Sequence, residues 1–182
     1  ENMLNSALSL AKRGFMLTPC MPNRVETLSY QFRTNASREP VILKQWFGDN
    51  DFNIGIITGA DSGVFVVTVE PDSIDEFKGR GQIPATLTQI SPTGAMMYFF
   101  VYTGRIRTKL RGLWPNKLGR SAYHKKMKID AFEGFVLAAP SVVDDVAYQI
   151  VDYSEIAQAP AWLNDMIQVP LKNADRNKPV PS

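Results

Sequence analysis

The middle of this chain is a series of short apolar runs bounded by Gly, Pro, Asn or Ser, and this pattern most restricts the fold. The clearest runs are Asn53–Ile57, Val64–Val69, Leu87–Ile90 and Met96–Tyr102. Their length and their β-branched and aromatic residues favour buried strands over helices. Three later runs extend the pattern, at Ile129–Ala131, Phe135–Ala138 and Ala147–Val151.

Helical spacing of apolar residues marks segments on both sides of these runs. Met3–Ala11 has this spacing, and Gly14 follows at a C-cap position. Further short helices are predicted at Pro40–Phe47, Ser73–Phe77 and Pro160–Ile167. Helices that come first, with strands in the middle, predict an α+β domain with a central, largely antiparallel sheet flanked by helices.

One further strand and two connections between strands are also predicted. Phe15–Thr18 reads as a strand that ends at Pro19. Asn53–Ile57 and Val64–Val69 are expected to pair through the Gly-rich turn between them. Leu87–Ile90 and Met96–Tyr102 flank a second turn, Ser91–Gly94.

The size and composition of the chain limit its class. With 182 residues and 45% hydrophobic content it can bury one good core, so one domain over residues 1–168 is expected. Residues 169–182 are rich in Pro and Lys and predict a linker or disordered tail. The single cysteine, Cys20, excludes an internal disulfide and fits a reducing cytoplasm. No apolar run approaches about 18 residues, so a membrane-spanning protein is not expected.

Charge is divided unevenly along the sequence. From Phe77 to Ile129 there is no Asp or Glu but eleven Lys and Arg, whereas the rest of the chain sums to −9. Trp114, Tyr123 and the only histidine, His124, lie among these basic residues. Fixed positive charge with interleaved aromatic rings is typical of a nucleic-acid groove. The alternative is a solvated loop whose charge meets the acidic remainder across the fold.

Three motifs occur in a specific order. They are Asn53–Gly59 continuing into Ser62–Pro71, then Ser91–Phe100, and finally Ile129-Asp130 leading into Phe135–Ser141. With the flanking helical segments, this order resembles the bifunctional primase/polymerase (prim-pol) domain of the archaeo-eukaryotic primase superfamily. The resemblance covers nearly the whole chain up to about Ile167. Such domains occur in replication proteins of plasmids, phages and other mobile elements, usually ahead of a helicase.

The resemblance implies two-metal nucleotidyl transfer, in which strand carboxylates hold Mg²⁺ or Mn²⁺. The first pair of ligand positions falls on Thr68 and Glu70, and the third carboxylate would be Asp130, although its spacing to Ser141 looks shorter than the family's. Glu70 and Asp130 are therefore the candidate catalytic and metal-binding residues. Thr68 offers a neutral hydroxyl where a carboxylate is expected, and Met97 stands where the family places a histidine that contacts the triphosphate.

Candidate binding residues follow from the resemblance and from the charge distribution. Those for the nucleotide are Thr58, Gly59, Ser91, Thr93 and Gly94. Those for nucleic acid come from the basic segment: Arg105, Arg107, Lys109, Arg111, Lys125 and Lys126. Asp61, Asp72 and His124 are candidates to compensate for Thr68 and Met97.

Each candidate also has a purely structural interpretation. Glu70 can be a strand-end surface carboxylate, and Asp130 can pair with Lys126 or Lys128. The Gly and Ser residues of both turns suit ordinary turn chemistry, and Met97 lies in what reads most simply as a buried strand.

Three functions remain open from the sequence. The first is a primase/DNA polymerase, weakened or inactivated at Thr68 and Met97, that uses primed or single-stranded DNA and nucleoside triphosphates. The second is a non-catalytic module that binds nucleic acid and assists a helicase or replication initiator. The third is a nucleotide sensor, which would keep the two turns and have no need of the basic segment.

Overall fold

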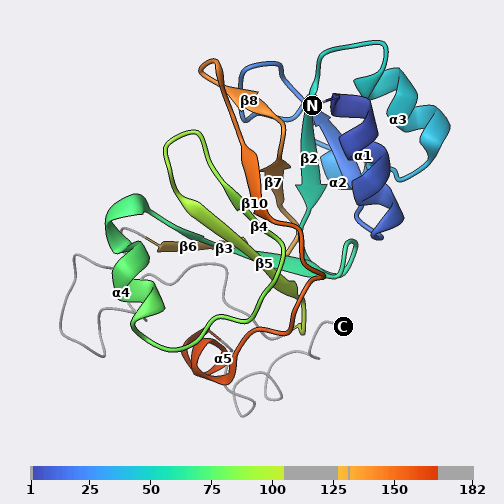
Figure 1. The fold of residues 1–182 in the computed structure, drawn as a ribbon. Helices are drawn as coiled ribbons and strands as arrows, with labels where there is room; N and C mark the ends of the chain where they lie inside the picture. Colours follow the sequence, from blue (N-terminus) through green and yellow to red (C-terminus); the bar gives the residue numbers. More distant parts are fainter. Residues whose placement is uncertain (1, 105–126, 131, 168–182) are drawn as a thin grey trace.

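Figure 1 shows the computed structural model, in which residues 2–104, 127–130 and 132–167 are described. The helices are α1 (Met3–Lys12), α2 (Phe32–Asn35), α3 (Pro40–Phe47), the 3-10 turn η1 (Pro71–Ser73), α4 (Ile74–Lys78) and α5 (Ala161–Ile167). The strands are β1 (Leu17–Cys20), β2 (Asn53–Ile57), β3 (Val64–Val69), β4 (Thr88–Ile90), β5 (Met96–Val101), β6 (Met127–Asp130), β7 (Phe135–Ala138), β8 (Val142–Val143), β9 (Val146–Ala147) and β10 (Gln149–Asp152).

The described strands form two main sheets and a small hairpin. One sheet has five strands in the order β10-β4-β5-β3-β6, a second has three in the order β1-β2-β7, and β8 pairs with β9. Every ladder between these strands is antiparallel. This arrangement confirms the predicted α+β class with antiparallel sheets flanked by helices.

The five-stranded sheet is covered on both faces. Phe65 and Val67 of β3 pack on Phe77 of α4 and Leu163 of α5, so we call this the helix-covered face. The side chains that alternate with them point the other way. They pack with the three-stranded sheet and with α1 and α3, and we call this the inner face. In Figure 1, α4 and α5 lie at one side of the molecule and α1 and α3 at the other.

One predicted strand pairing is wrong. β2 pairs with β1 and β7, whereas β3 pairs with β5 and β6, so the two consecutive strands belong to different sheets. Only an isolated bridge joins Gly59 to Val64. Gly59 and Gly63 have φ of 95° and 70°, a conformation that glycine adopts without steric cost. The turn between them therefore carries the chain from one sheet to the other instead of closing a hairpin.

Other local predictions agree more closely with the structure. α3 begins at Pro40, and β4 pairs with β5 around the Ser91–Gly94 turn. β1, however, runs through Pro19 rather than ending before it. That is possible because β1 lies at an edge of its sheet, where a missing backbone N–H is tolerated. None of the described helices has the length and apolar character needed to cross a bilayer.

Candidate functional site

A single cross-strand row runs through Thr68 at the centre of the five-stranded sheet. Thr68 stands opposite Met97 of β5 on one side and Lys128 of β6 on the other. Gln89 of β4 stands opposite Met97 and extends the row. Residues that are directly opposite in antiparallel strands project from the same face, with α-carbons about 5 Å apart. We call Lys128, Thr68, Met97 and Gln89 the Thr68 row; it lies on the inner face.

The Met97 end of the row joins the two sheets. The Gln89 amide donates to the Leu137 carbonyl (Nε2 to O, 2.7 Å) and to Met97 Sδ (3.3 Å), and its Oε1 accepts from the Ala139 backbone N–H (3.0 Å). Both Gln89 and Met97 are buried. Met97 is thus a buried strand residue, the simpler of the two interpretations of its position. The Met97 thioether lies buried where the two sheets meet, and it has no hydrogen to donate to a phosphate.

The Lys128 end of the row carries charge. The Lys128 side chain is 65% exposed, and its Nζ lies 3.5 Å from Oδ1 of Asp130, whose side chain is 18% exposed. The structure thus contains the Asp130 to Lys128 ion pair that was one alternative for this carboxylate. Burial raises the pKa of Asp130, while the Lys128 ammonium opposes that shift. Burial also raises the pKa of Tyr148, and the neighbouring Asp130 charge adds to the effect.

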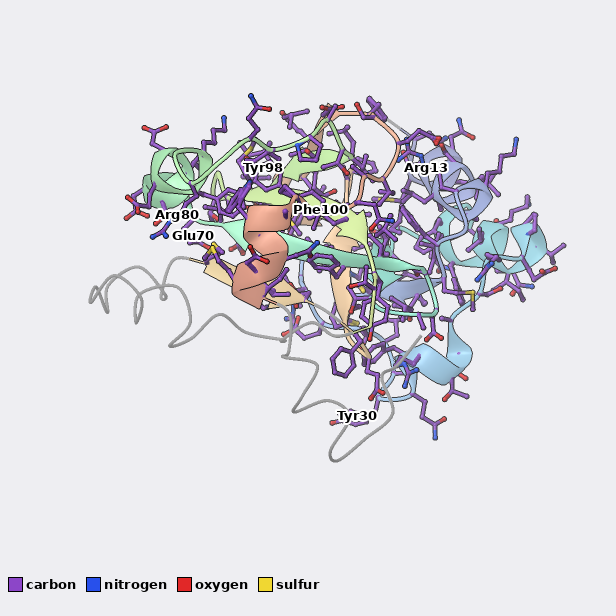
Figure 2. The ribbon with its side chains drawn as sticks, turned by 90° about the horizontal axis from the view of Figure 1, so that it is seen from below. Arg13, Tyr30, Glu70, Arg80, Tyr98 and Phe100 are labelled. Carbon is purple, nitrogen blue, oxygen red and sulfur yellow. The ribbon has the colours of Figure 1, made fainter. Side chains whose placement is uncertain are left out.

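Glu70 follows β3 directly. Its backbone is still extended (φ −65°, ψ 155°), so its side chain falls on the same face as Thr68. The structure places Glu70 at the α4 end of the sheet, away from Arg13 on α1 (Figure 2). The side chain is partly buried.

The Ser91–Gly94 turn lies at this same end of β3. Ser91 Oγ and Thr93 Oγ1 lie 3.1 Å apart, and Ser91 Oγ accepts from the Ala95 backbone N–H at 3.1 Å. Gly94 packs so closely on Pro71 that an added Cβ would lie 3.2 Å from Pro71 Cγ. The structure therefore places Gly94 of this turn against Pro71, the residue that follows Glu70.

Thr58 and Gly59 lie at the other end of β3. The Thr58 hydroxyl accepts from the Gly134 N–H (3.3 Å), and the Thr58 backbone exchanges bonds with Gly134 and Glu133. Thr58 is only 1% exposed, so its polar groups are used to hold β2 to the start of β7. β3 is six residues long, which separates this turn from Ser91–Gly94 by about 20 Å. The five candidate nucleotide residues therefore form two separate groups.

The candidates for compensation are equally separated. Asp61 lies in the turn before β3 and pairs with Arg33 (Oδ2 to Nε, 3.3 Å), far from Thr68. Asp72 lies in η1, two residues beyond Glu70, and is exposed. His124 lies outside the described residues. So do the six candidate nucleic-acid residues, Arg105, Arg107, Lys109, Arg111, Lys125 and Lys126, and the predicted tail at 169–182.

The candidate metal ligands do not converge. Asp130 stands opposite Val66, four residues before Glu70, which offsets the two backbones by about 13 Å along the strands. Carboxylates that share one Mg²⁺ each place an oxygen about 2.1 Å from it, which this offset does not permit. The residue opposite Thr68 is the cationic Lys128. Within the described ranges, no three acidic, His or Cys side chains gather as a metal site.

The sequence also supports a comparison with known families. The family model for the N-terminal domain of bifunctional DNA primase/polymerase (Prim-Pol) matches residues 7–162. The chain belongs to the prim-pol family. Among solved structures, this prim-pol domain is similar to the AEP domain of the cyanophage S-2L primase-polymerase (PrimPol), with 10% identity and a TM-score of 0.42. The match covers 91% of this chain and 96% of that one. No curated protein sequence matches.

Sequence reasoning missed two members of the Thr68 row of this prim-pol domain. The sequence presents Lys128 only as an ion-pair partner for Asp130, and it does not single out Gln89. One signal for Lys128 lies in the resemblance, which implies a longer spacing to Ser141 than Asp130 has and so favours an earlier residue of β6 opposite Thr68. Gln89 gave no such signal, because its role depends on β7, 48 residues away.

Proposed function

We propose that this prim-pol domain binds primed or single-stranded DNA and nucleoside triphosphates, and that its nucleotidyl transfer is weak or absent. One observation carries the second half of this proposal. In the Thr68 row, a hydroxyl, a buried thioether and a lysine stand where carboxylates and a phosphate donor would be needed. Loss of one such electrostatic contact costs about 3 kcal/mol or more in the transition state.

Support for DNA binding comes from the family and from charge. A domain of the primase-polymerase type implies contact with DNA and nucleotides. The acid-free segment from Phe77 to Ile129 holds eleven of the twenty basic residues. Phosphate contacts from Lys and Arg release counterions, so affinity should fall steeply with salt. Such a module would help to load a helicase or initiator during replication of a mobile element.

The DNA-binding test uses fluorescence anisotropy with a labelled primed template over a salt series. Arg105→Glu with Arg107→Glu should weaken binding to all sequences alike and flatten the salt dependence. Lys12→Glu with Lys44→Glu makes the same change in net charge outside the acid-free segment and should have a smaller effect. DNA affinity that does not depend on salt would contradict a nucleic-acid groove in the acid-free segment. An equal loss of DNA affinity in the two double variants would contradict it as well.

A second candidate, an active primase-polymerase, also has specific support. Glu70 and Asp130 remain on the face of Thr68, and the Ser91–Gly94 turn lies next to Glu70. For this candidate, Mg²⁺ or Mn²⁺ at Glu70 and at Asp130 remains a prediction, with the two carboxylates too far apart to share one ion. Primer extension by the purified chain with each ion separates the two candidates. Extension that is abolished by both Glu70→Gln and Asp130→Asn would establish activity, and no extension by a chain that binds primed DNA would support the binding module.

A further inference from the structure

The Thr68 row contains a lysine at the position that decides whether a metal ion can bind there. On the neighbouring strands, the position best placed to share an ion with residue 68 is the one directly opposite it. On β6 that position is Lys128, and on β5 it is the buried Met97. An ammonium group repels a divalent cation, so this end of the row disfavours Mg²⁺ rather than binding it.

We propose that the Lys128 ammonium supplies the fixed positive charge of this site, so that a nucleoside triphosphate binds there without a divalent ion. This inference rests on the nucleotide binding proposed above and specifies how it occurs. A lysine ammonium is a compact charge with three donors, which suits phosphate oxygens. The inference concerns binding and assigns no chemical step to the site.

The surroundings of Lys128 fit this role. Its side chain is 65% exposed and so is accessible to a ligand, while the ion pair with Asp130 holds it over the inner face. The Ser91–Gly94 turn lies at the same end of β3 and β5, with an exposed Thr93. A triphosphate that reaches from Lys128 toward this turn would meet one ammonium group and a hydroxyl. It would also pass Glu70, whose negative charge opposes it.

Isothermal titration calorimetry with dATP tests the proposal, once in EDTA and once in Mg²⁺. The parent chain should bind dATP in EDTA at least as tightly as in Mg²⁺, because the metal-free triphosphate carries more negative charge. Lys128→Gln should weaken binding in EDTA by about tenfold or more, the value of a hydrogen bond to a charged group. Lys44→Gln is the matched control, since Lys44 is 70% exposed and pairs with Asp49 at 4.0 Å; it should leave binding unchanged.

Glu70→Gln adds a test for which the two mechanisms predict opposite changes. If Lys128 holds the triphosphate, removing the negative charge of Glu70 strengthens dATP binding in EDTA. If the site is a metal centre, the same change removes a metal ligand and weakens dATP binding in Mg²⁺. Thermal unfolding of every variant checks that it is folded.

The possible outcomes separate this inference from the function on which it rests. Binding of dATP only in Mg²⁺, or an equal loss in Lys128→Gln and Lys44→Gln, overturns the role of Lys128. Primed DNA binding without any dATP binding overturns it together with the proposed nucleotide binding, while leaving the DNA-binding proposal intact. A chain that binds neither dATP nor primed DNA contradicts the proposed function itself. Binding in EDTA that depends on Lys128 and increases in Glu70→Gln supports the inference.

Discussion

The two faces of the five-stranded sheet are made from the same strands but differ in chemistry. On the helix-covered face, the buried cluster consists of apolar and aromatic residues such as Val67 and Phe100. On the inner face, the Thr68 row places a lysine, a threonine and a glutamine among apolar neighbours. A buried polar group lowers stability unless it is hydrogen-bonded, and the buried Gln89 meets this condition by joining the two sheets. The Lys128 side chain is 65% exposed, and we propose that it binds a ligand.

The largest predicted difference between the faces comes from the same substitution at neighbouring positions. Val67→Asp places a carboxylate among the residues under α4 and α5, where no cation is present among the described members of the cluster. An uncompensated buried charge lowers the free energy of unfolding by about 3–5 kcal/mol. Thr68→Asp places the carboxylate opposite Lys128 on a partly exposed position and should change it by less than about 1 kcal/mol. Urea unfolding measures both, and similar losses would contradict the assignment of faces.

The next effect concerns the seam between the two sheets. Gln89→Leu keeps the volume but leaves the Leu137 carbonyl and the Ala139 N–H without their partner. We expect the free energy of unfolding to fall by about 2–3 kcal/mol, because each orphaned buried group costs about 1–3 kcal/mol. Gln149→Leu on the exposed edge strand β10 is the control and should cost under about 0.5 kcal/mol. A small effect at Gln89 would mean that the seam does not hold the sheets together.

A third prediction adds carboxylates to the inner face, where the described residues include no cluster of three acidic, His or Cys side chains. Thr68→Asp with Lys128→Asp places two carboxylates opposite each other, one step from Glu70. Mn²⁺ should then bind about tenfold more tightly or better than to the parent, as measured by calorimetry. Met97 is kept, since a buried imidazole without a partner would cost roughly 1–3 kcal/mol.

Thr68→Asp alone is the control for this design, because it leaves the Lys128 ammonium opposite the new carboxylate. It should gain little Mn²⁺ affinity. If the double variant folds and binds Mn²⁺ no better than the parent, the register does not bring these two positions together. Faster primer extension by the double variant would show in addition that the rest of the site is still shaped for transfer.

These comparisons also show which parts of the fold could be predicted from sequence. Pro40 fixed the start of α3 because proline suits a first helical turn, and the Ser91–Gly94 turn located the β4–β5 hairpin. The order of the motifs indicated the family that the family model then matched. These signals are local or lie in the order of segments, so the sequence contains them directly.

Long-range pairing could not be predicted in the same way. Two apolar runs joined by a short Gly-rich turn look like a hairpin, and nothing local shows that β2 and β3 enter different sheets. Alternation places Lys128 and Asp130 on one face, but which of them stands opposite Thr68 depends on a register between strands sixty residues apart. For that reason the sequence suggests Glu70 and Asp130 as candidate ligands but does not itself place Lys128 opposite Thr68.

The smallest predicted effect separates the two residues at the centre of the inner face. Thr68→Val preserves shape and removes only the hydroxyl, so the free energy of unfolding should change by less than about 0.5 kcal/mol. If Lys128 supplies the charge that holds the triphosphate, Thr68→Val should weaken dATP binding in EDTA by no more than about fivefold, the value of one neutral hydrogen bond. Calorimetry on Thr68→Val and Lys128→Gln side by side ranks the two residues. If Thr68→Val loses more dATP affinity than Lys128→Gln, the threonine hydroxyl rather than the lysine charge dominates recognition of the triphosphate. The difference between the two faces would then depend on hydrogen bonding rather than on charge.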